Sequence, residues 1–275
     1  MGIASVIPFV GVARAATFED ALAEIEDNPE EMANVRGLAE LDMHEFPYID
    51  DSIGMAASPQ KNIARKRSFT SISDRALDLI VFSEVSSYEL YQSKYTKPVW
   101  PGGKSGVTVA IGFDLGYTTP VNYKEDWELI LDEPRYGLLS SVIGLTGANA
   151  KAALKSVQTV EIDYDLAEQQ FRTRSLPCYV AETENAFANT RALSEDSFGA
   201  LVSLVYNRGS SSTAKKPDPD DRRKEIRAIK EHMKNKEFDR IPSEITNMKR
   251  LWHPTNERGL HLRRDAEAAL FAAGL

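Results

Sequence analysis

The chain has 275 residues, of which 42% are hydrophobic and 27% charged, so it is long enough for one large domain and unlike a disordered or collagen-like sequence. Its one cysteine, Cys178, excludes an intrachain disulfide and a two-cysteine metal site, and we expect it to be a small buried residue. The net charge of −8 belongs mainly to residues 1–60, which hold twelve acidic residues against Arg14 and Arg36. The remainder is nearly neutral, which argues against a protein that binds nucleic acid.

The first residues, MGIASVIPFVGVARAA, contain a short apolar run that ends in small residues. No basic segment precedes the run and Pro8 interrupts it, so we expect an N-terminal arm or a docking helix in preference to a signal peptide. The run is also too short to span a bilayer as a helix. Residues 17–43 are expected to be helical, because their apolar residues are partly periodic and Thr17 with Asp20 resembles a helix cap.

Residues 46–71 lose this periodicity and include the basic run KNIARKRS, which predicts a solvated linker and a protease-sensitive site. We therefore divide the chain into an acidic N-terminal region with its linker, residues 1–71, and a domain formed by residues 72–275.

The domain opens with a helix capped by Ser73 or Asp74, whose apolar residues run to Phe82. The segment WPGGKSGVTVAIGFDLGY follows, and its glycines and β-branched residues predict a turn and short strands. A cap at Ser194 and a stop at Gly209 delimit one later helix. Other helices are expected at 126–134, 149–160, 163–176, 180–190, 221–235 and 257–272. The fold class is therefore expected to be α+β and mainly α, with one small β element.

Two carboxylates and a hydroxyl stand near the junction of that first helix and the β segment. Glu84 follows the apolar run LDLIVF, and an apolar setting raises the pKa of a carboxyl group, as a general acid requires. Thr108 and Asp114 have the even spacing that places side chains on one face of an extended chain, unless Gly112 breaks the alternation. These are the groups that glycoside hydrolysis uses. The same residue types also serve as a surface charge and an Asx-turn residue, and Glu89 is a rival acid.

The helix that ends in Glu84, followed by a glycine-rich hairpin with the string GVTVAIGFDLG, resembles the pesticin-like muramidases, relatives of the phage-type lysozymes. Two later segments resemble the same family: LVSLVYNRGS is similar to its buried helix, and GLHLRRDAEAALF to its arginine-rich terminal helix. The resemblance runs from Ser73 to the C-terminus and implies a lysozyme-like fold. It differs from the phage enzymes in that no acid lies between Pro101 and Thr108.

Carried over to this chain, the resemblance implies that Glu84 protonates the glycosidic oxygen and that Thr108 and Asp114 orient or activate water. The candidates for binding substrate are Tyr88, Tyr91, Trp100, Asn207 and Arg208. The alternative is that the aromatic residues pack the helix against the hairpin, and that the last two end a helix and pair with a surface acid. We expect Arg263 and Arg264 to hold the fold together by bonding to carboxylates.

No cofactor or metal is expected, because the four histidines show no paired spacing and GGKSG lacks the spacing of a P-loop. The resemblance implies a peptidoglycan hydrolase that cuts the β-1,4 bond between N-acetylmuramic acid and N-acetylglucosamine: an antibacterial effector, bacteriocin or endolysin. The alternatives are a wall-binding module without catalysis and a hydrolase of another amino-sugar polymer such as chitin.

The expected partners are peptidoglycan glycan strands, an immunity or inhibitor protein, and a secretion adaptor or chaperone that binds the N-terminal region. The expected route runs from the cytoplasm, where the protein is made, to the periplasm or cell wall of target bacteria.

Overall fold

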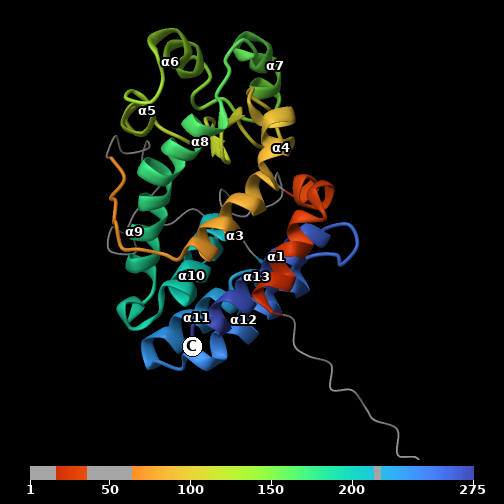
Figure 1. Ribbon diagram of the computed structural model, residues 1–275, viewed down its shortest axis with the longest axis vertical. Coiled ribbons are helices and arrows are strands. Elements are labelled where there is room, and N and C mark those ends of the chain that lie inside the picture. Colours follow the sequence, from red (N-terminus) through yellow and green to blue (C-terminus); the bar gives the residue numbers. More distant parts are fainter. Residues whose placement is uncertain (1–16, 36–63, 214–217) are drawn as a thin grey trace, which may run out of the picture.

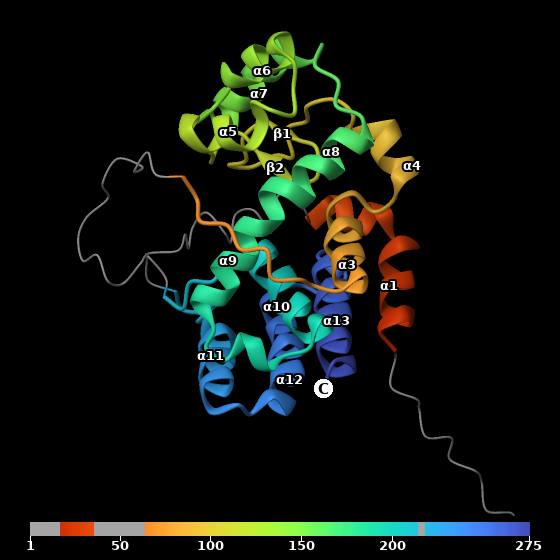
Figure 2. The ribbon, with the colours of Figure 1, turned by 60° about the vertical axis from the view of Figure 1, so that its left-hand side comes forward.

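The computed structural model describes residues 17–35, 64–213 and 218–275. Helices dominate these residues, and their β structure is one two-stranded antiparallel sheet. The expected class, α+β and mainly α, is therefore confirmed for the described part of the chain. The helices form two lobes, which are joined by a long helix that passes between them (Figures 1 and 2).

The first lobe, here called the hairpin lobe, is formed by residues 88–162 and lies at the top of Figure 2. Its two strands pair antiparallel, with Thr108 opposite Asp114 and Val109 opposite Phe113. Short helices surround this hairpin and bury its apolar side chains around Trp127. The elements are α4 (Tyr88–Leu90), the π-helical turn η1 (Tyr91–Tyr95), β1 (Thr108–Val109), β2 (Phe113–Asp114), α5 (Pro120–Trp127), α6 (Glu133–Ser140) and α7 (Gly147–Val157).

The connecting helix runs from α8 (Tyr164–Gln170) through the π-helical turn η2 (Phe171–Ser175) into α9 (Leu176–Ala186). Asp163 caps its start by accepting a hydrogen bond from the amide of Leu166. Pro177 lies two residues after the π-helical turn, and a proline lacks the amide hydrogen that an uninterrupted α-helix would use. The widened turn therefore lets the helix continue through the proline and span both lobes.

The second lobe, here called the helical lobe, is built around α10, whose residues are nearly all buried. Apolar side chains of the surrounding helices form a second core with it. Its elements are α1 (Phe18–Glu26), a helix at 29–35, α3 (Asp74–Val85), η3 (Thr190–Ala192), α10 (Glu195–Arg208), α11 (Lys224–Asn235), η4 (Phe238–Arg240), α12 (Ile241–Asn247), η5 (Met248–Leu251) and α13 (Arg258–Ala273).

The predicted helix caps are confirmed where they fall on described residues. The side chains of Ser73 and Ser194 accept hydrogen bonds from the amides of Ala76 and Ser197, and Gly209 ends α10. Thr17 and Asp20 form a reciprocal capping box. The helix predicted at 17–43 is interrupted at Asp27 and Asn28, which separate α1 from the helix at 29–35, and residues 36–43 lie outside the described part of the chain.

Two other helix predictions are wrong in part. The helix expected at 126–134 is interrupted, because α5 ends at Trp127 and Asp132 caps a new helix, α6. The helix expected at 180–190 ends at Ala186, where Phe187 takes an extended conformation. Helix α12, which begins beside Pro242, was not predicted. Each error concerns where a helix begins or ends, which depends on tertiary packing more than on apolar spacing.

The acidic segment at 17–35 packs against the helical lobe (Figure 2). Arg258 of α13 pairs with Glu24 at 3.0 Å, and Arg75 of α3 pairs with Glu19 at 2.7 Å. Arginines of the main body thus offset part of the N-terminal acidity. The division of the chain after residue 71 stays a prediction, because residues 1–16 and 36–63 lie outside the described part.

An extended strap, residues 64–71, runs between the two lobes beside the connecting helix (Figure 2). Its backbone hydrogen-bonds to α9. Arg65 and Arg67 donate hydrogen bonds to Asp126 of α5, whose side chain is only 1% exposed. The described part of the predicted linker is therefore bound to the body of the protein. Within that same part of the chain, no helix has the length and apolarity needed to cross a bilayer.

Candidate functional site

Glu84 lies in the last turn of α3, as the sequence predicted, and is 8% exposed. The helix ends two residues later at Ser86, which has a positive φ of 63° and turns the chain away. Because the preceding apolar residues Leu79 and Ile80 are fully buried, they fix the helix against the core. The carboxylate consequently has a defined position at the boundary between the two lobes.

The setting of Glu84 is not the purely apolar one that the sequence predicted. Its Oε1 accepts a hydrogen bond of 2.8 Å from Nη1 of Arg263, whose side chain is 2% exposed. Arg263 also donates to Glu267 at 3.2 Å and to the carbonyl of Ser203. Burial alone would lower the pKa of Arg263, but the neighbouring charges of Glu84 and Glu267 raise it above its ordinary value. The expected role of Arg263, bonding to carboxylates that hold the fold together, is therefore seen.

A tight turn between the two strands lies directly against this carboxylate. Ala110 and Gly112 both have positive φ, 53° and 68°. A Cβ at position 112 would lie 2.9 Å from Oε2 of Glu84 and 3.0 Å from the hydroxyl of Tyr206. Glycine is required there for both the backbone conformation and the close approach. Gly112 thus allows the hairpin turn to lie close to the carboxylate of Glu84.

Thr108 and Asp114 are brought together by strand pairing, since directly opposed residues in an antiparallel pair share a face. Even spacing predicted a shared face, but the chain reverses at the turn, so the two side chains meet across the hairpin. Asp114 accepts hydrogen bonds from the amides of Gly106 at 3.0 Å and Gly116 at 2.7 Å. Its carboxylate is therefore held in one orientation. The bond from Gly116 fits the alternative role of Asp114 as an Asx-turn residue.

The hydroxyl of Thr108 is buried, and no described protein group hydrogen-bonds to it. A buried hydroxyl of this kind can still bind a water molecule, which is the role that the sequence analysis assigned to it. Thr108 and Asp114 thus differ in character: Thr108 has unused hydrogen-bonding capacity, whereas the carboxylate of Asp114 is committed to two backbone amides.

A cavity of about 120 Å³ adjoins the turn, on the side where the hairpin lobe, the connecting helix and α10 meet. Gly112 lines this cavity and approaches Oε2 of Glu84 closely on its other side, whereas the side chains of Glu84 and Thr108 do not line it. The cavity combines phenol rings with polar and charged groups. Its lining residues are Arg65, Gly112, Phe113, Asp114, Tyr117, Thr118, Asn122, Ser175, Tyr179 and Tyr206.

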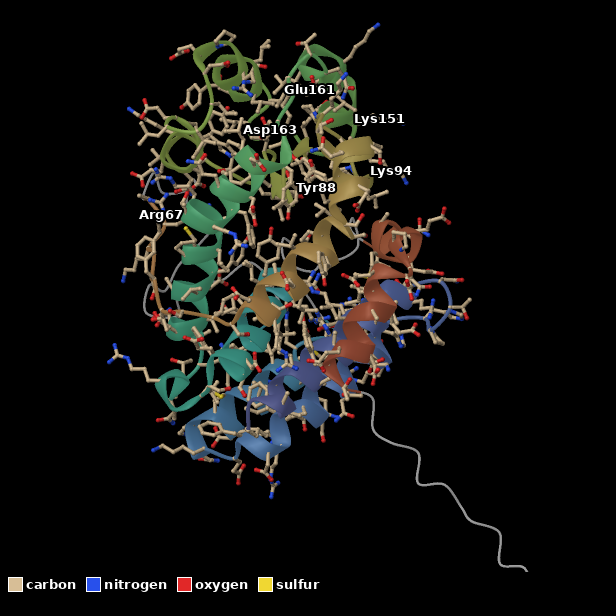
Figure 3. The ribbon with its side chains drawn as sticks, viewed as in Figure 1. Arg67, Tyr88, Lys94, Lys151, Glu161 and Asp163 are labelled. Carbon is tan, nitrogen blue, oxygen red and sulfur yellow. The ribbon has the colours of Figure 1, made fainter. Side chains whose placement is uncertain are left out.

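None of the three aromatic residues proposed to bind sugar lines this cavity. Tyr91 is fully buried and its hydroxyl donates to the carbonyl of Ile162, so we remove it from the candidates for sugar binding. Trp100 is partly buried and donates from Nε1 to the carbonyl of Ser105. Tyr88 is 52% exposed and lies on the opposite side of the connecting helix from Arg67 (Figure 3). Of these three residues, only Tyr88 has a largely solvent-exposed side chain.

Asn207 and Arg208 are also packing residues in the structure. Asn207 is 5% exposed and accepts a hydrogen bond from Arg264. Arg208 is 1% exposed, lies over the ring of Trp252, and donates to a backbone carbonyl of residue Arg222. Both residues therefore pack within the protein and present little surface to a ligand. Glu89, the rival acid, is exposed on α4.

The residues that sequence reasoning missed come mainly from segments far from Glu84. Tyr179 reaches the cavity from the connecting helix, and Arg65 reaches it from the strap. Tyr117 directly follows the GFDLG string, and Tyr206 stands in the LVSLVYNRGS segment, so both were available as signals. For Arg65 and Tyr179 the sequence offered none, because their position depends on how the two lobes are joined.

Among the described residues, no group of three or more His, Cys, Asp or Glu side chains is arranged to hold a metal ion. Comparison with known families and with curated proteins found no family model and no curated protein that matches this chain. The geometry of the site and the resemblance described above are therefore the basis for proposing a function.

Proposed function

We propose that this chain has a lysozyme-like fold and is a glycoside hydrolase that cleaves the β-1,4 bond between N-acetylmuramic acid and N-acetylglucosamine in peptidoglycan. The observation that carries the proposal is the position of Glu84. It is a buried carboxylate at a helix end, with Oε2 against Gly112, a residue that also lines the cavity between the lobes. A general acid of a glycosidase needs a fixed, partly desolvated carboxyl group beside a cleft.

In the proposed reaction, Glu84 transfers its proton to the glycosidic oxygen as the bond to the anomeric carbon breaks. Water then supplies the oxygen that bonds to this carbon, and the proton that the water loses restores the protonated form of Glu84. Thr108 supports the proposal because its hydroxyl is available to hold that water. The fixed carboxylate of Asp114, which lines the cavity, would stabilise the positive charge that develops on the sugar ring.

The fixed position of Asp114 also supports a second candidate, a wall-binding module without catalysis. Both carboxylate oxygens accept backbone hydrogen bonds, so Asp114 serves the hairpin whether or not a water is activated. Catalysis by the first candidate therefore depends on Glu84 more than on Asp114.

The broader proposal is an antibacterial enzyme that reaches the wall or periplasm of target bacteria as an effector, a bacteriocin or an endolysin. The bound strap and the docked acidic helix support a role of the N-terminal region in contact with the rest of the chain. An adaptor, chaperone or immunity protein would be a partner of this system.

The test is digestion of purified peptidoglycan by the full chain, followed by mass spectrometry of the released muropeptides. Products with N-acetylmuramic acid at the reducing end are expected. Binding to peptidoglycan without release of muropeptides would support the wall-binding module. Cleavage confined to chitin oligomers would show that the enzyme acts on another amino-sugar polymer. Either result would contradict the first candidate.

A further inference from the structure

The hydroxyl of Tyr206 holds the turn that covers Glu84. It donates a hydrogen bond of 2.9 Å to the carbonyl of Ile111, the middle residue of the turn. Ile111 is flanked by Ala110 and Gly112, which both have positive φ, so the turn has a backbone conformation that needs support from its surroundings. Tyr206 provides such support from α10, a helix of the other lobe.

The ring of Tyr206 itself contacts two other aromatic rings. Its centroid lies 4.4 Å from that of Tyr179 and 5.8 Å from that of Phe171, both in the connecting helix. Tyr206 and Tyr179 also line the cavity beside Asp114. A rigid ring of this kind places its hydroxyl with little conformational freedom, which favours a defined hydrogen bond to the turn.

The same turn determines the surroundings of Glu84. A Cβ at Gly112 would meet Oε2 of Glu84 and the hydroxyl of Tyr206 at nearly equal distances, 2.9 and 3.0 Å. The phenol and the carboxylate therefore lie around one backbone position. A shift of the Ile111 carbonyl away from Tyr206 would move Gly112 with it, since the two residues are adjacent, and would alter what faces Oε2.

We propose that Tyr206 is a positioning residue, which fixes the turn at 110–112 over Glu84 so that Oε2 of the acid keeps its alignment with the cleft. This inference rests on the proposed function of Glu84 as the general acid. Tyr206 touches no reacting atom in this account. It acts through the backbone carbonyl of Ile111 and the close approach of Gly112 to the carboxylate.

The test compares Tyr206→Phe with a matched control, Tyr123→Phe. Tyr123 is a buried tyrosine of α5 whose hydroxyl also donates to a backbone carbonyl at 2.9 Å, but it does not line the cavity. Each variant loses one hydroxyl and keeps its ring. We expect Tyr206→Phe to lower kcat about 3- to 10-fold, the range that corresponds to one hydrogen bond, with KM within about twofold of wild type. Tyr123→Phe should keep the wild-type kcat.

Hydrogen exchange provides a second measurement that does not depend on activity. Peptides that cover residues 107–115 should exchange faster in Tyr206→Phe than in wild type or Tyr123→Phe. If wild type cleaves peptidoglycan and Tyr206→Phe retains its kcat and its exchange rates, the positioning role is wrong while the proposed function stands. An equal loss of kcat in both variants would also overturn it. If wild type releases no muropeptides, the proposed function fails, and this inference fails with it.

Discussion

The guanidinium of Arg263 lies 2.8 Å from the carboxylate of Glu84, although 179 positions separate the two residues in the chain. The last helix of the protein thereby sets the charge environment of an acid in the first helix after the strap. Glu267 and Ser203 complete the arrangement, because they accept hydrogen bonds from the remaining nitrogen atoms of Arg263. The side chain of Arg263 thus connects the candidate acid in α3 to the last helix, α13.

Arg263→Met should destabilise the protein strongly, because it leaves the buried carboxylate of Glu84 without its cation and leaves Glu267 with Arg264 as its remaining partner. Breaking a buried ion pair from one side typically costs about 3–5 kcal/mol. Chemical denaturation measures this free energy of unfolding. Arg172→Met is the control, since Arg172 pairs with Glu168 on a solvent-exposed part of the connecting helix and should lose less than about 1 kcal/mol. Similar losses in the two variants would contradict the claim that the buried ion pairs of Arg263 stabilise the fold more than an exposed pair does.

Gly112→Ala should reduce both stability and hydrolysis. Alanine at a φ of 68° costs about 1–2 kcal/mol, and its Cβ would lie 2.9 Å from Oε2 of Glu84, so the acid or the turn must move. Gly137→Ala is the matched control, because Gly137 lies in α6 with open space at its Cβ position. That variant should gain about 0.5–1 kcal/mol and keep full activity. Thermal melting and muropeptide release measure the two effects, and wild-type behaviour of Gly112→Ala would refute the tight contact.

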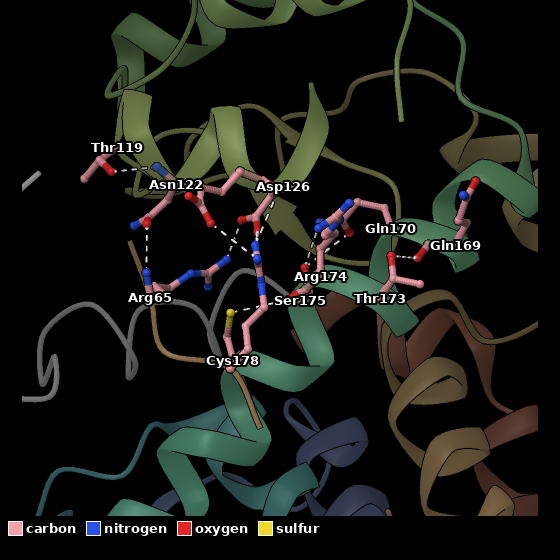
Figure 4. Close-up of polar contacts among 12 residues, drawn as sticks. Arg65, Thr119, Asn122, Asp126, Gln169, Gln170, Thr173, Arg174, Ser175 and Cys178 are labelled. Atoms are coloured by element: carbon pink, nitrogen blue, oxygen red, sulfur yellow. Dashed lines mark hydrogen bonds and ion pairs between the residues drawn. The ribbon is translucent and has the colours of Figure 1, made fainter. Parts of the chain in front are cut away.

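Asp126→Asn should free the strap, because Asp126 is the buried partner of both Arg65 and Arg67. Figure 4 shows its contact with Arg65. An amide binds two guanidinium groups less well than a carboxylate does. Limited trypsin digestion, read by mass spectrometry, should cut after Arg65 and Arg67 several-fold faster than in wild type. Glu128→Gln changes an exposed carboxylate near the end of the same helix and should leave the cleavage rate unchanged. Equal rates in all three proteins would show that this ion pair does not hold the strap.

Glu182→Gln should stabilise the protein at neutral pH. Burial raises the pKa of Glu182, so the folded state binds its proton more tightly than the unfolded state does. As pH rises from the ordinary value of a glutamate, the unfolded state loses its proton first, and wild type loses stability over that window. Glutamine escapes this loss and can still accept the hydrogen bond from Ser210. The gain in Tm should therefore vanish at acidic pH, and a gain that is constant with pH would argue against this origin.

Local features of the fold could be predicted from the sequence. Ser73, Ser194 and Gly209 delimit helices through hydrogen bonds or backbone angles within a few residues, so their effect is visible in the sequence itself. The hairpin was predicted because glycines and β-branched residues cluster in one segment. The short helices α6 and α12 were missed or misplaced, since tertiary contacts determine where such helices begin and end.

The site was predictable only in part, for the same physical reason. The position of Glu84 at a helix end follows from the apolar run before it, but its partner Arg263 does not, because no periodicity relates residues so far apart. Tyr91 was a candidate for binding substrate, with packing as the alternative, and it is buried, since aromatic spacing does not tell a packing ring from a binding ring. Arg65 and Tyr179 enter the cavity through the joining of the two lobes, which only the folded chain shows.

The most direct test of Glu84 as the general acid is the rate of muropeptide release from purified peptidoglycan by Glu84→Gln, with Glu89→Gln as the matched control. Both variants replace a carboxyl by an amide, but Glu89 is exposed on α4 while Glu84 is buried against Gly112. With folding verified by circular dichroism, Glu84→Gln should lose at least about 100-fold in rate, and Glu89→Gln should match wild type. Activity of Glu84→Gln equal to that of wild type would contradict the account.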